Sequence, residues 1–239
     1  MDGSEMATHV VSEPAILYLG TPVVLISSEN EDGSANLAPM SSVFWLGWRA
    51  VLGLSAVSKT TQNMLRTRQC VLNLPSVEQV AAVNRLARLT GSDPVPAGKL
   101  ARGYTYEKDK FGRAGLTPVA SHTVRPPRAL ECPIQLEAEV VACHDLAQEP
   151  SQENPALRGA VKSFEVRIQR VHVQPHLLVA GEPNRIDPDQ WRPLIMSFQK
   201  FYGLEAGQLH DSSLARIPEA MYRSPDVDRA RSAALLADA

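Results

Sequence analysis

The sequence predicts a mainly β domain, a barrel of largely antiparallel strands with a few inserted helices. Short runs rich in Val, Ile and Leu recur along the chain and are separated by Gly, Pro, Asn and Asp. Two or three segments instead have apolar residues at helical spacing. With 239 residues, of which 44% are hydrophobic, the chain is long enough for one substantial core.

The first third of the chain is predicted to form strands. We expect them at Tyr18–Ser28, Val43–Leu46 and Ala50–Ser55, where β-branched and apolar residues predominate. Gly33 closes the turn after the first strand because it can adopt a positive φ. The segment 36–42, NLAPMSS, lies between apolar runs, and its Pro and paired hydroxyls predict a break in the sheet.

Two helices are expected next. Lys59–Thr67 contains no Gly or Pro, and we expect a short helix there that begins at Ser58 or Lys59. After a strand at Cys70–Ser76, Ser76 and Gln79 have the spacing of a capping box for a second helix. We expect that helix to end at Gly91.

The second half of the chain returns to strands after a polar, turn-rich excursion over residues 93–116. Strands are predicted at Glu131–Cys143 and Ser163–Val173. In the latter, the apolar alternation slips by one residue after Ile168, which indicates a β-bulge. A last helix is predicted at Trp191–Leu204.

This organisation predicts one main domain. We divide the chain into an N-terminal extension at residues 1–14, a domain at residues 15–210 and a peripheral C-terminal tail at residues 211–239. The tail has little periodicity until its last few residues.

Composition narrows the possible partners and compartment. A net charge of −2 and a pI near 6.3 give no reason to expect nucleic acid or an anionic membrane as partner. The acidic N-terminus does not resemble a signal peptide, and the most apolar run is too short to span a bilayer. The three cysteines are far apart and odd in number, so we expect no disulfide framework and a cytoplasmic location.

The start of the predicted helix at Lys59 has the chemistry of a phosphate site. Free backbone N–H groups and the helix dipole favour an anion there. The hydroxyls and the single ammonium group nearby come from Ser41, Ser42, Ser55, Ser58, Lys59, Thr60 and Thr61. The equal alternative is that Ser58 and the threonines simply cap the helix.

Other motifs are not supported by the sequence. The glycines near Lys99 have the wrong spacing for a P-loop, and there is no strand-linked Rossmann glycine pattern. The six histidines are scattered, so no metal site is expected, and no Ser-His-Asp arrangement can be assigned.

Several segments in order resemble the flavin reductase-like family. They are GTPVVLISSENEDGSANLAPMSSV, LGLSAVSKTTQN, CVLNLP and KFGRAGLTPVASHTVRPPRALECPIQLEAEVV, within residues 15–205. The resemblance implies an FMN-binding split β-barrel with Greek-key, largely antiparallel strands, and a homodimer with FMN near the subunit interface. It also implies that the segment 36–42 lines the flavin and that the helix start binds its phosphate. The implied cofactor-binding residues are Asn36, Ala38, Pro39, Met40, Ser41, Ser42, Ser55, Ser58, Lys59, Thr60, Thr61 and Asn63.

The function implied is that of an FMN-dependent oxidoreductase, which passes electrons to a small acceptor, another flavin or a partner enzyme such as an oxygenase. Members that use NADH commonly carry a Gly-Asp-His segment, where this chain has a longer loop over residues 145–159 and the pair His144-Asp145. NAD(P)H is therefore an uncertain donor, and no catalytic residue is assigned. A non-enzymatic FMN-binding electron carrier is the main alternative, and a barrel that has lost its flavin is a third.

Overall fold

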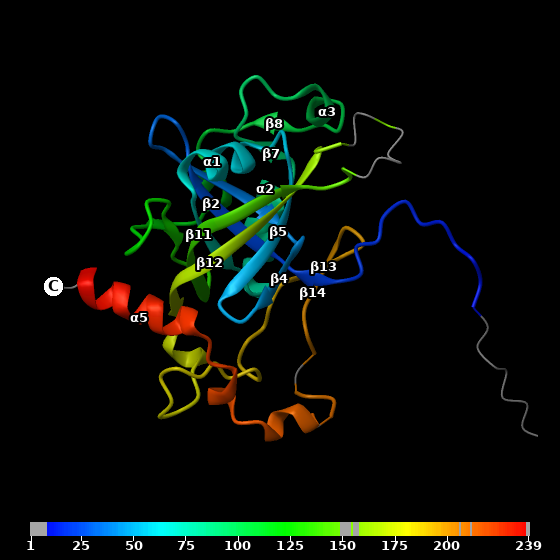
Figure 1. Ribbon diagram of the computed structural model, residues 1–239. Helices are drawn as coiled ribbons and strands as arrows, with labels where there is room; N and C mark the ends of the chain where they lie inside the picture. Colours follow the sequence, from blue (N-terminus) through cyan, green and yellow to red (C-terminus); the bar gives the residue numbers. More distant parts are fainter. Residues whose placement is uncertain (1–8, 149–153, 155–157, 206, 211, 238–239) are drawn as a thin grey trace, which may run out of the picture.

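The main element of the computed structural model is a seven-stranded antiparallel sheet (Figure 1). The structure describes residues 9–148, 154, 158–205, 207–210 and 212–237. The strand order is β3-β2-β6-β11-β12-β5-β4. The strands are β2 (Val24–Glu29), β3 (Ala35–Met40), β4 (Val43–Leu46), β5 (Arg49–Ser55), β6 (Gln69–Leu74), β11 (Ile134–Asp145) and β12 (Val161–Val173).

The two edges of this sheet are consecutive in the chain. β3 forms one edge and β4 the other, and only Ser41 and Ser42 connect them. Because a residue of extended chain spans at most about 3.6 Å, Met40 and Val43 lie within about 11 Å of each other. The sheet must therefore curl strongly. Each edge strand pairs with one neighbour, β3 with β2 and β4 with β5, so the sheet is not closed into a barrel. The Greek-key connectivity stays a prediction.

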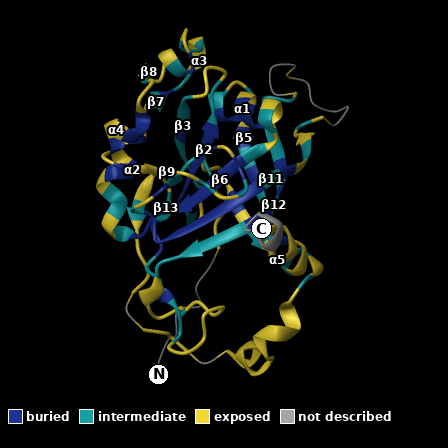
Figure 2. Ribbon diagram, turned by 90° about the vertical axis from the view of Figure 1, so that its left-hand side faces the viewer, coloured by how far each residue is buried: buried dark blue, intermediate teal, exposed yellow. Residues whose placement is uncertain are grey.

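The curled sheet is buried on both faces near β2. Val24 and Ile26 point into the core cluster enclosed by the sheet. Val23 and Leu25 belong to a second cluster outside it, which the helices α2 (Val80–Leu86) and α4 (Lys110–Ala114) cover. Figure 2 shows the central strands as the most buried part of the chain. This double burial explains why β2 has a continuous apolar start instead of strict alternation.

The helix starts were predicted correctly, but the second helix is shorter than expected. α1 spans Lys59–Thr67 with Ser58 as its N-cap, and Ser76 and Gln79 form the predicted capping box. The box opens a 3₁₀ turn, η1 (Val77–Gln79), which leads into α2. The prediction that Gly91 ends this helix is wrong. A strand, β7 (Leu89–Thr90), intervenes and pairs in parallel with β8 (Thr105–Tyr106).

The predicted bulge in the last long strand is confirmed. Glu137 of β11 pairs with Arg170, whereas the next residue, Ala138, pairs with Ile168. Gln169 is therefore the extra residue on β12. The slip of the apolar pattern seen in the sequence is its direct consequence.

Three expectations about secondary structure need correction. The segment 36–42 does not break the sheet before Ser41, because edge strand β3 includes Pro39, and an edge strand tolerates a missing N–H. The strand expected from Tyr18 is instead β1 (Thr21–Pro22) followed by β2. The helix predicted at Trp191–Leu204 is a hairpin of β13 (Ile195–Ser197) and β14 (Lys200–Tyr202).

That hairpin turns through two residues with positive φ, Phe198 at 43° and Gln199 at 66°. β1 pairs with β13, which forms a separate three-stranded sheet with β14. The smaller remaining elements are α3 (Ala97–Leu100), β9 (Pro118–Val119), β10 (Arg128–Ala129), η2 (Pro175–Leu177), η3 (Ser213–Arg216) and η4 (Glu219–Tyr222).

The C-terminal segment ends in a helix, α5 (Pro225–Ala237), drawn in red in Figure 1. α5 packs against β12, with Ala230 buried. Asp226 near its start accepts a hydrogen bond from Nε of Arg49 at 2.9 Å. The segment after residue 210 is thus in contact with the sheet, and the proposed division into three segments stays a prediction.

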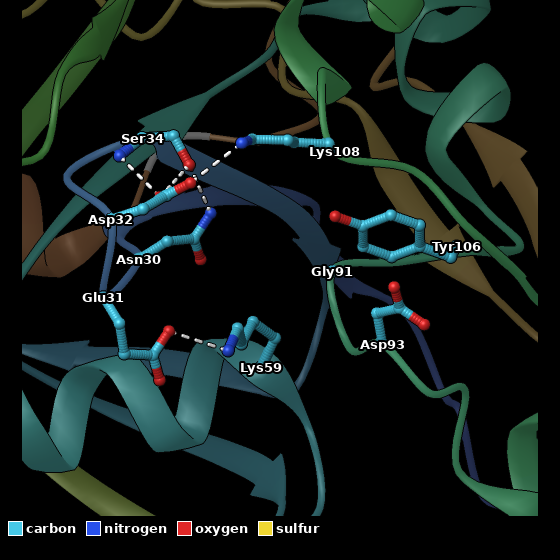
Figure 3. Close-up of a pocket in the computed structure, with 9 residues that line it drawn as sticks. All are labelled: Asn30, Glu31, Asp32, Ser34, Lys59, Gly91, Asp93, Tyr106 and Lys108. Carbon is cyan, nitrogen blue, oxygen red and sulfur yellow. Dashed lines mark hydrogen bonds and ion pairs between the residues drawn. The ribbon is translucent and has the colours of Figure 1, made fainter.

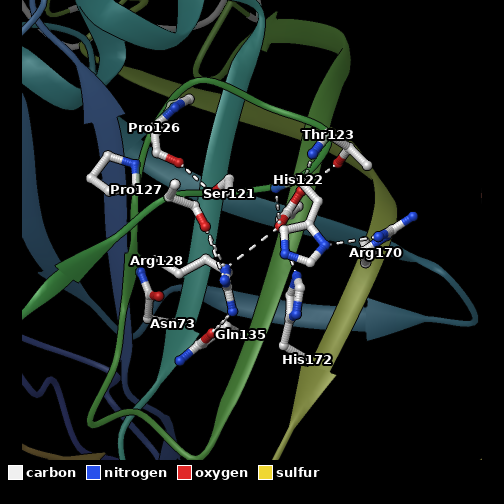
Figure 4. Close-up of polar contacts among 12 residues, drawn as sticks. Asn73, Ser121, His122, Thr123, Pro126, Pro127, Arg128, Gln135, Arg170 and His172 are labelled. Atoms are coloured by element: carbon white, nitrogen blue, oxygen red, sulfur yellow. Dashed lines mark hydrogen bonds and ion pairs between the residues drawn. The ribbon is translucent and has the colours of Figure 1, made fainter. Parts of the chain in front are cut away.

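A buried carboxylate, that of Glu137, connects the loop after β9 to the outer face of the sheet. It accepts hydrogen bonds from the amides of His122 at 2.9 Å and Thr123 at 2.6 Å, and it lies 2.7 Å from Nε2 of His172. Figure 4 shows the two histidines and the neighbouring Arg128 gathered at this point. Burial alone would raise the pKa of Glu137, but His172, Thr123 and the two amides lower it to about 2. The carboxylate is therefore ionised and fully bonded.

We expect Glu137→Gln to be less stable than the wild type by about 3 kcal/mol at pH 7. The folded pKa is depressed, so this contribution is complete above the ordinary value of 4.5 and is lost as the pH falls toward 2. The stability gap between the two proteins should shrink by about 2 kcal/mol from pH 7 to pH 3 in urea unfolding. Glu139→Gln, on the same strand but partly exposed, is the matched control. A gap that does not change with pH would contradict this role of the charge.

Candidate functional site

The first turn of α1 is built by its own capping residues. The Ser58 hydroxyl accepts from the Thr61 amide at 3.1 Å, and the Thr61 hydroxyl donates to the Ser55 carbonyl at 2.8 Å. Of these three predicted phosphate ligands, Ser58 is the N-cap of α1, and the hydroxyl of Thr61 is bonded to the backbone of Ser55. Within the described chain, the amides of Lys59 and Thr60 have no backbone or side-chain acceptor. They are the donors left for an anion.

Asn36 connects β3 to this helix start. Its side chain is buried, and its Nδ2 donates to the Thr60 hydroxyl at 3.1 Å and to the Ser28 hydroxyl at 3.2 Å. Its Oδ1 accepts from the ammonium of Lys110 at 2.9 Å. One amide thus joins β2, β3, α1 and α4.

Lys110 is the residue that the sequence reasoning missed. It is 3% exposed, and no carboxylate among the described residues lies within ion-pair distance of it. Burial first, and then the charge of Lys99, lower the pKa of Lys110 to about 7, although Glu107 acts in the opposite direction. A helical reading of Lys110–Ala114 could have found it. Lys110 and Ala114 are four residues apart on one face, and that face is buried.

Because Gly91 has no side chain, the segment that follows β7 can pack directly against Asn36 and Lys59. A Cβ atom there would be 2.6 Å from Oδ1 of Asn36 and 3.2 Å from Cγ of Lys59. Any larger residue would push the excursion away from α1 or displace Asn36. The close approach, not a special φ, is the reason for glycine at this position.

A cavity of about 190 Å³ opens beside Lys59 (Figure 3). The turn between β2 and β3 supplies Glu31 and Asp32 on one side, and the excursion supplies Asp93, Tyr106 and Lys108 on the other. Two ion pairs occupy its rim, Lys59 with Glu31 at 2.8 Å and Lys108 with Asp32 at 2.9 Å. The ammonium that the sequence assigned to a phosphate therefore has a carboxylate partner, and Glu31 is more than half exposed.

The predicted site residues fall into two groups. Around α1 lie Asn36, Ser55, Ser58, Lys59, Thr60, Thr61 and Asn63. The buried amide of Asn63 donates to Ser28 at 3.1 Å and to Asn30 at 2.9 Å, so it supports the helix from below. The second group continues along β3 and the link to β4 and comprises Ala38, Pro39, Met40, Ser41 and Ser42.

The link itself is tied to the neighbouring strands through its backbone. The Ser42 carbonyl accepts from the Gly53 amide at 2.8 Å, and the Ser41 carbonyl accepts from the Thr21 hydroxyl. Four residues of strand, about 13 Å, separate Asn36 from Met40. The two groups are thus the two ends of one elongated track along β3.

Comparison with known proteins assigns the chain to a family. The model of the flavin reductase like domain matches residues 17–205. The chain belongs to this family. YdfE of Bacillus subtilis (strain 168) is 36% identical over 192 residues, which cover 80% of this chain and 87% of that protein. Membership indicates a flavin-related oxidoreductase role.

Solved structures of other proteins share the fold. Flavoredoxin of Desulfovibrio vulgaris (Miyazaki F) superposes with a TM-score of 0.67 at 16% identity, over 87% of this chain and 98% of that one. Nitrilotriacetate monooxygenase component B from Bacillus cereus gives a TM-score of 0.61 at 19% identity, over 81% of this chain and 88% of that one. These likenesses confirm the mainly β fold with inserted helices.

Neither a metal-binding cluster nor a membrane-spanning helix is found in the described part of the chain. No cluster of three or more His, Cys, Asp or Glu side chains is arranged to hold a metal ion there. Each helix in the same residues is too short or too polar to cross a bilayer.

We expect Lys110→Met to stabilise the flavin-free protein most below pH 7. Because the pKa of Lys110 falls on folding from 10.5 to about 7, the charged side chain opposes folding fully below pH 7, and this cost is relieved as the pH rises toward 10.5. The stability of the wild type should therefore rise relative to that of the variant by about 3 kcal/mol between pH 6 and pH 9 in urea unfolding. Lys108→Met, two residues away and exposed, is the control. Parallel stability curves for wild type and Lys110→Met would show that this lysine keeps its ordinary pKa.

Proposed function

We propose that the chain binds FMN and works as an FMN-dependent oxidoreductase, passing electrons to a small acceptor, another flavin or a partner enzyme. The observation that carries the proposal is the buried chain of hydrogen bonds from Lys110 through Asn36 to Thr60, which ends at the open first turn of α1. A buried, unpaired ammonium is costly, and an anion bound nearby offsets that cost.

The residues at the start of α1 fit a phosphate monoester. The free amides of Lys59 and Thr60 would donate to its oxygens, and the helix dipole would favour its charge. Lys59 can exchange Glu31 for phosphate at little cost, because Glu31 is 57% exposed and an ion pair with a solvated partner contributes only about 0–1 kcal/mol. Lys110 adds a second positive charge behind the first.

The edge of β3 fits the rest of the molecule. FMN is elongated, with its phosphate at one end and its ring at the other, and the predicted residues form a track of similar shape. β3 pairs on one side with β2, so backbone groups on its other side are open to a ligand. Bound there, FMN would supply the electron-accepting ring. The chain's own part is to hold the phosphate at α1 and to orient the ring end near Met40, Ser41 and Ser42.

A non-enzymatic FMN-binding electron carrier is the second candidate. The chain lacks the Gly-Asp-His segment that the family resemblance associates with nicotinamide. His144 and Asp145 end β11 instead, and Asp145 is ion-paired with Lys162. Much of the loop expected to differ, residues 149–153 and 155–157, lies outside the described residues. Whether NADH or NADPH can reduce the bound flavin therefore distinguishes the two candidates.

We also propose that the chain forms a homodimer. Phe44 and Leu46 project from edge strand β4 with 52% and 74% of their surfaces exposed. Apolar side chains on an unpaired edge are typical of a surface that another chain covers. A partner oxygenase is a further proposal, supported by the likeness to a monooxygenase component. The cytoplasmic location stays a prediction.

We expect the flavin-free protein to bind FMN more tightly than riboflavin, because riboflavin lacks the phosphate. Lys59→Ala should weaken FMN binding by about 1.5–3 kcal/mol and leave riboflavin binding nearly unchanged, since charge-assisted hydrogen bonds have about this strength. Quenching of flavin fluorescence gives both affinities. Lys200→Ala, which removes an exposed lysine of β14 in the separate three-stranded sheet, is the matched control. Equal affinities for FMN and riboflavin in the wild type would contradict the proposal that the start of α1 binds the phosphate.

We expect slow turnover with NADH or NADPH, although dithionite should reduce the bound FMN readily. Hydride transfer requires the nicotinamide to approach the flavin ring within about 3–3.5 Å, and no segment equivalent to Gly-Asp-His guides it. Stopped-flow measurement of flavin bleaching with each donor tests this. Fast, saturable oxidation of NADH would make the protein an ordinary flavin reductase and exclude the carrier.

A further inference from the structure

The cavity beside Lys59 bears on which flavin the site accepts. Lys59 forms part of its wall and is also the cation assigned above to the phosphate. On its inner side, Lys59 is held against Gly91 and Asn36, where there is no room for an added methyl group. A group attached to the outer side of the phosphate would therefore leave past Lys59 into this cavity.

The cavity carries an excess of negative charge. Glu31, Asp32 and Asp93 face two ammonium groups, those of Lys59 and Lys108. Within the residues described, Asp93 has no ion-pair partner. The hydroxyl of Ser34 and then Lys108 hold the pKa of Asp32 well below its usual range, and Lys59 lowers that of Glu31. Glu31 and Asp32 are thus charged at neutral pH.

The two common flavin nucleotides would meet this cavity differently. FMN ends in a monoester that carries nearly two negative charges at pH 7, all of them at α1. FAD keeps one charge on that phosphate and places a second phosphate, a ribose and an adenine beyond it. The cavity of about 190 Å³ is smaller than the roughly 300–1,000 Å³ of ordinary ligand pockets, and its carboxylates repel the second phosphate.

We propose that Asp32 and Asp93 make the site selective for a flavin monophosphate over flavin adenine dinucleotide. This inference rests on the proposed function. The cavity would disfavour a diphosphate at the neighbouring phosphate site and would not itself bind a second ligand. Glu31 has a different role, because it forms the ion pair with Lys59 in the flavin-free protein.

The test compares the affinities of the flavin-free full chain for FMN and FAD by fluorescence quenching. We expect the wild type to bind FMN at least tenfold more tightly. In the double variant Asp32→Asn with Asp93→Asn, the ratio of the two dissociation constants should fall at least threefold through tighter FAD binding. Asn at position 32 keeps the Oδ1 acceptor that the Ser34 amide uses at 3.0 Å, so the turn is preserved.

The matched control changes two exposed acids outside the cavity, Glu13→Gln with Glu182→Gln, and should keep the wild-type ratio. A second measurement needs no variant. Raising the salt concentration screens the repulsion, so the wild-type ratio should narrow between 50 mM and 500 mM NaCl.

Equal affinities for FMN and FAD in the wild type would overturn the inference, as would a double variant with the same ratio as the control. A ratio that does not change with salt would likewise count against charge repulsion. A wild type that binds neither flavin would instead refute the proposed function itself. The two failures are therefore distinguishable.

Discussion

The short link between β3 and β4 is the constraint on which the rest of the structure depends. Two residues join opposite edges of a seven-stranded sheet, so the sheet has to curl around its own interior. The curl creates one enclosed apolar cluster and leaves a second on the outside, which α2 and α4 cover. It also leaves β3 with an open side, next to the start of α1. The candidate site thus exists because the sheet curls without closing.

Polar residues buried beneath α1 give the site its rigidity. Ser28, Asn36, Thr60 and Asn63 form one hydrogen-bonded group between the sheet and the helix, and Lys110 joins it from α4. A buried network of this kind is stabilising when its members are satisfied. Two features remain costly: Oδ1 of Asn63 has no partner in the described structure, and the buried amine of Lys110 has no carboxylate partner there. Unpaired groups of this sort are expected where a ligand completes the interactions.

Local signals in the sequence were sufficient for part of the fold. Ser58, the capping box at Ser76 and the bulge at Gln169 were predictable because each depends on neighbours within a few residues. The hairpin of β13 and β14 was missed. Its strands have three residues each, too few to show alternation, and its turn uses positive φ at Phe198 and Gln199 without glycine.

The long-range part of the site could not be predicted in the same way. The hydrogen bond between Lys110 and Asn36 joins residues 74 positions apart, and no local sequence pattern predicts it. The ion pair between Lys59 and Glu31 also depends on how the turn after β2 folds back toward α1.

The extra residue in β12 determines which side chains of that strand reach the core. Before Gln169, the even-numbered residues Phe164, Val166 and Ile168 face the interior, whereas after it the odd-numbered Val171 and Val173 pack against the same core. At Gln169, the core-facing positions of β12 therefore change from even-numbered to odd-numbered residues. If Gln169 were paired as a regular residue of the ladder, the end of β12 would turn over, with His172 toward the apolar interior and the two valines outward. The bulge thus keeps both halves of β12 facing the same core, which regular pairing of this sequence would not do.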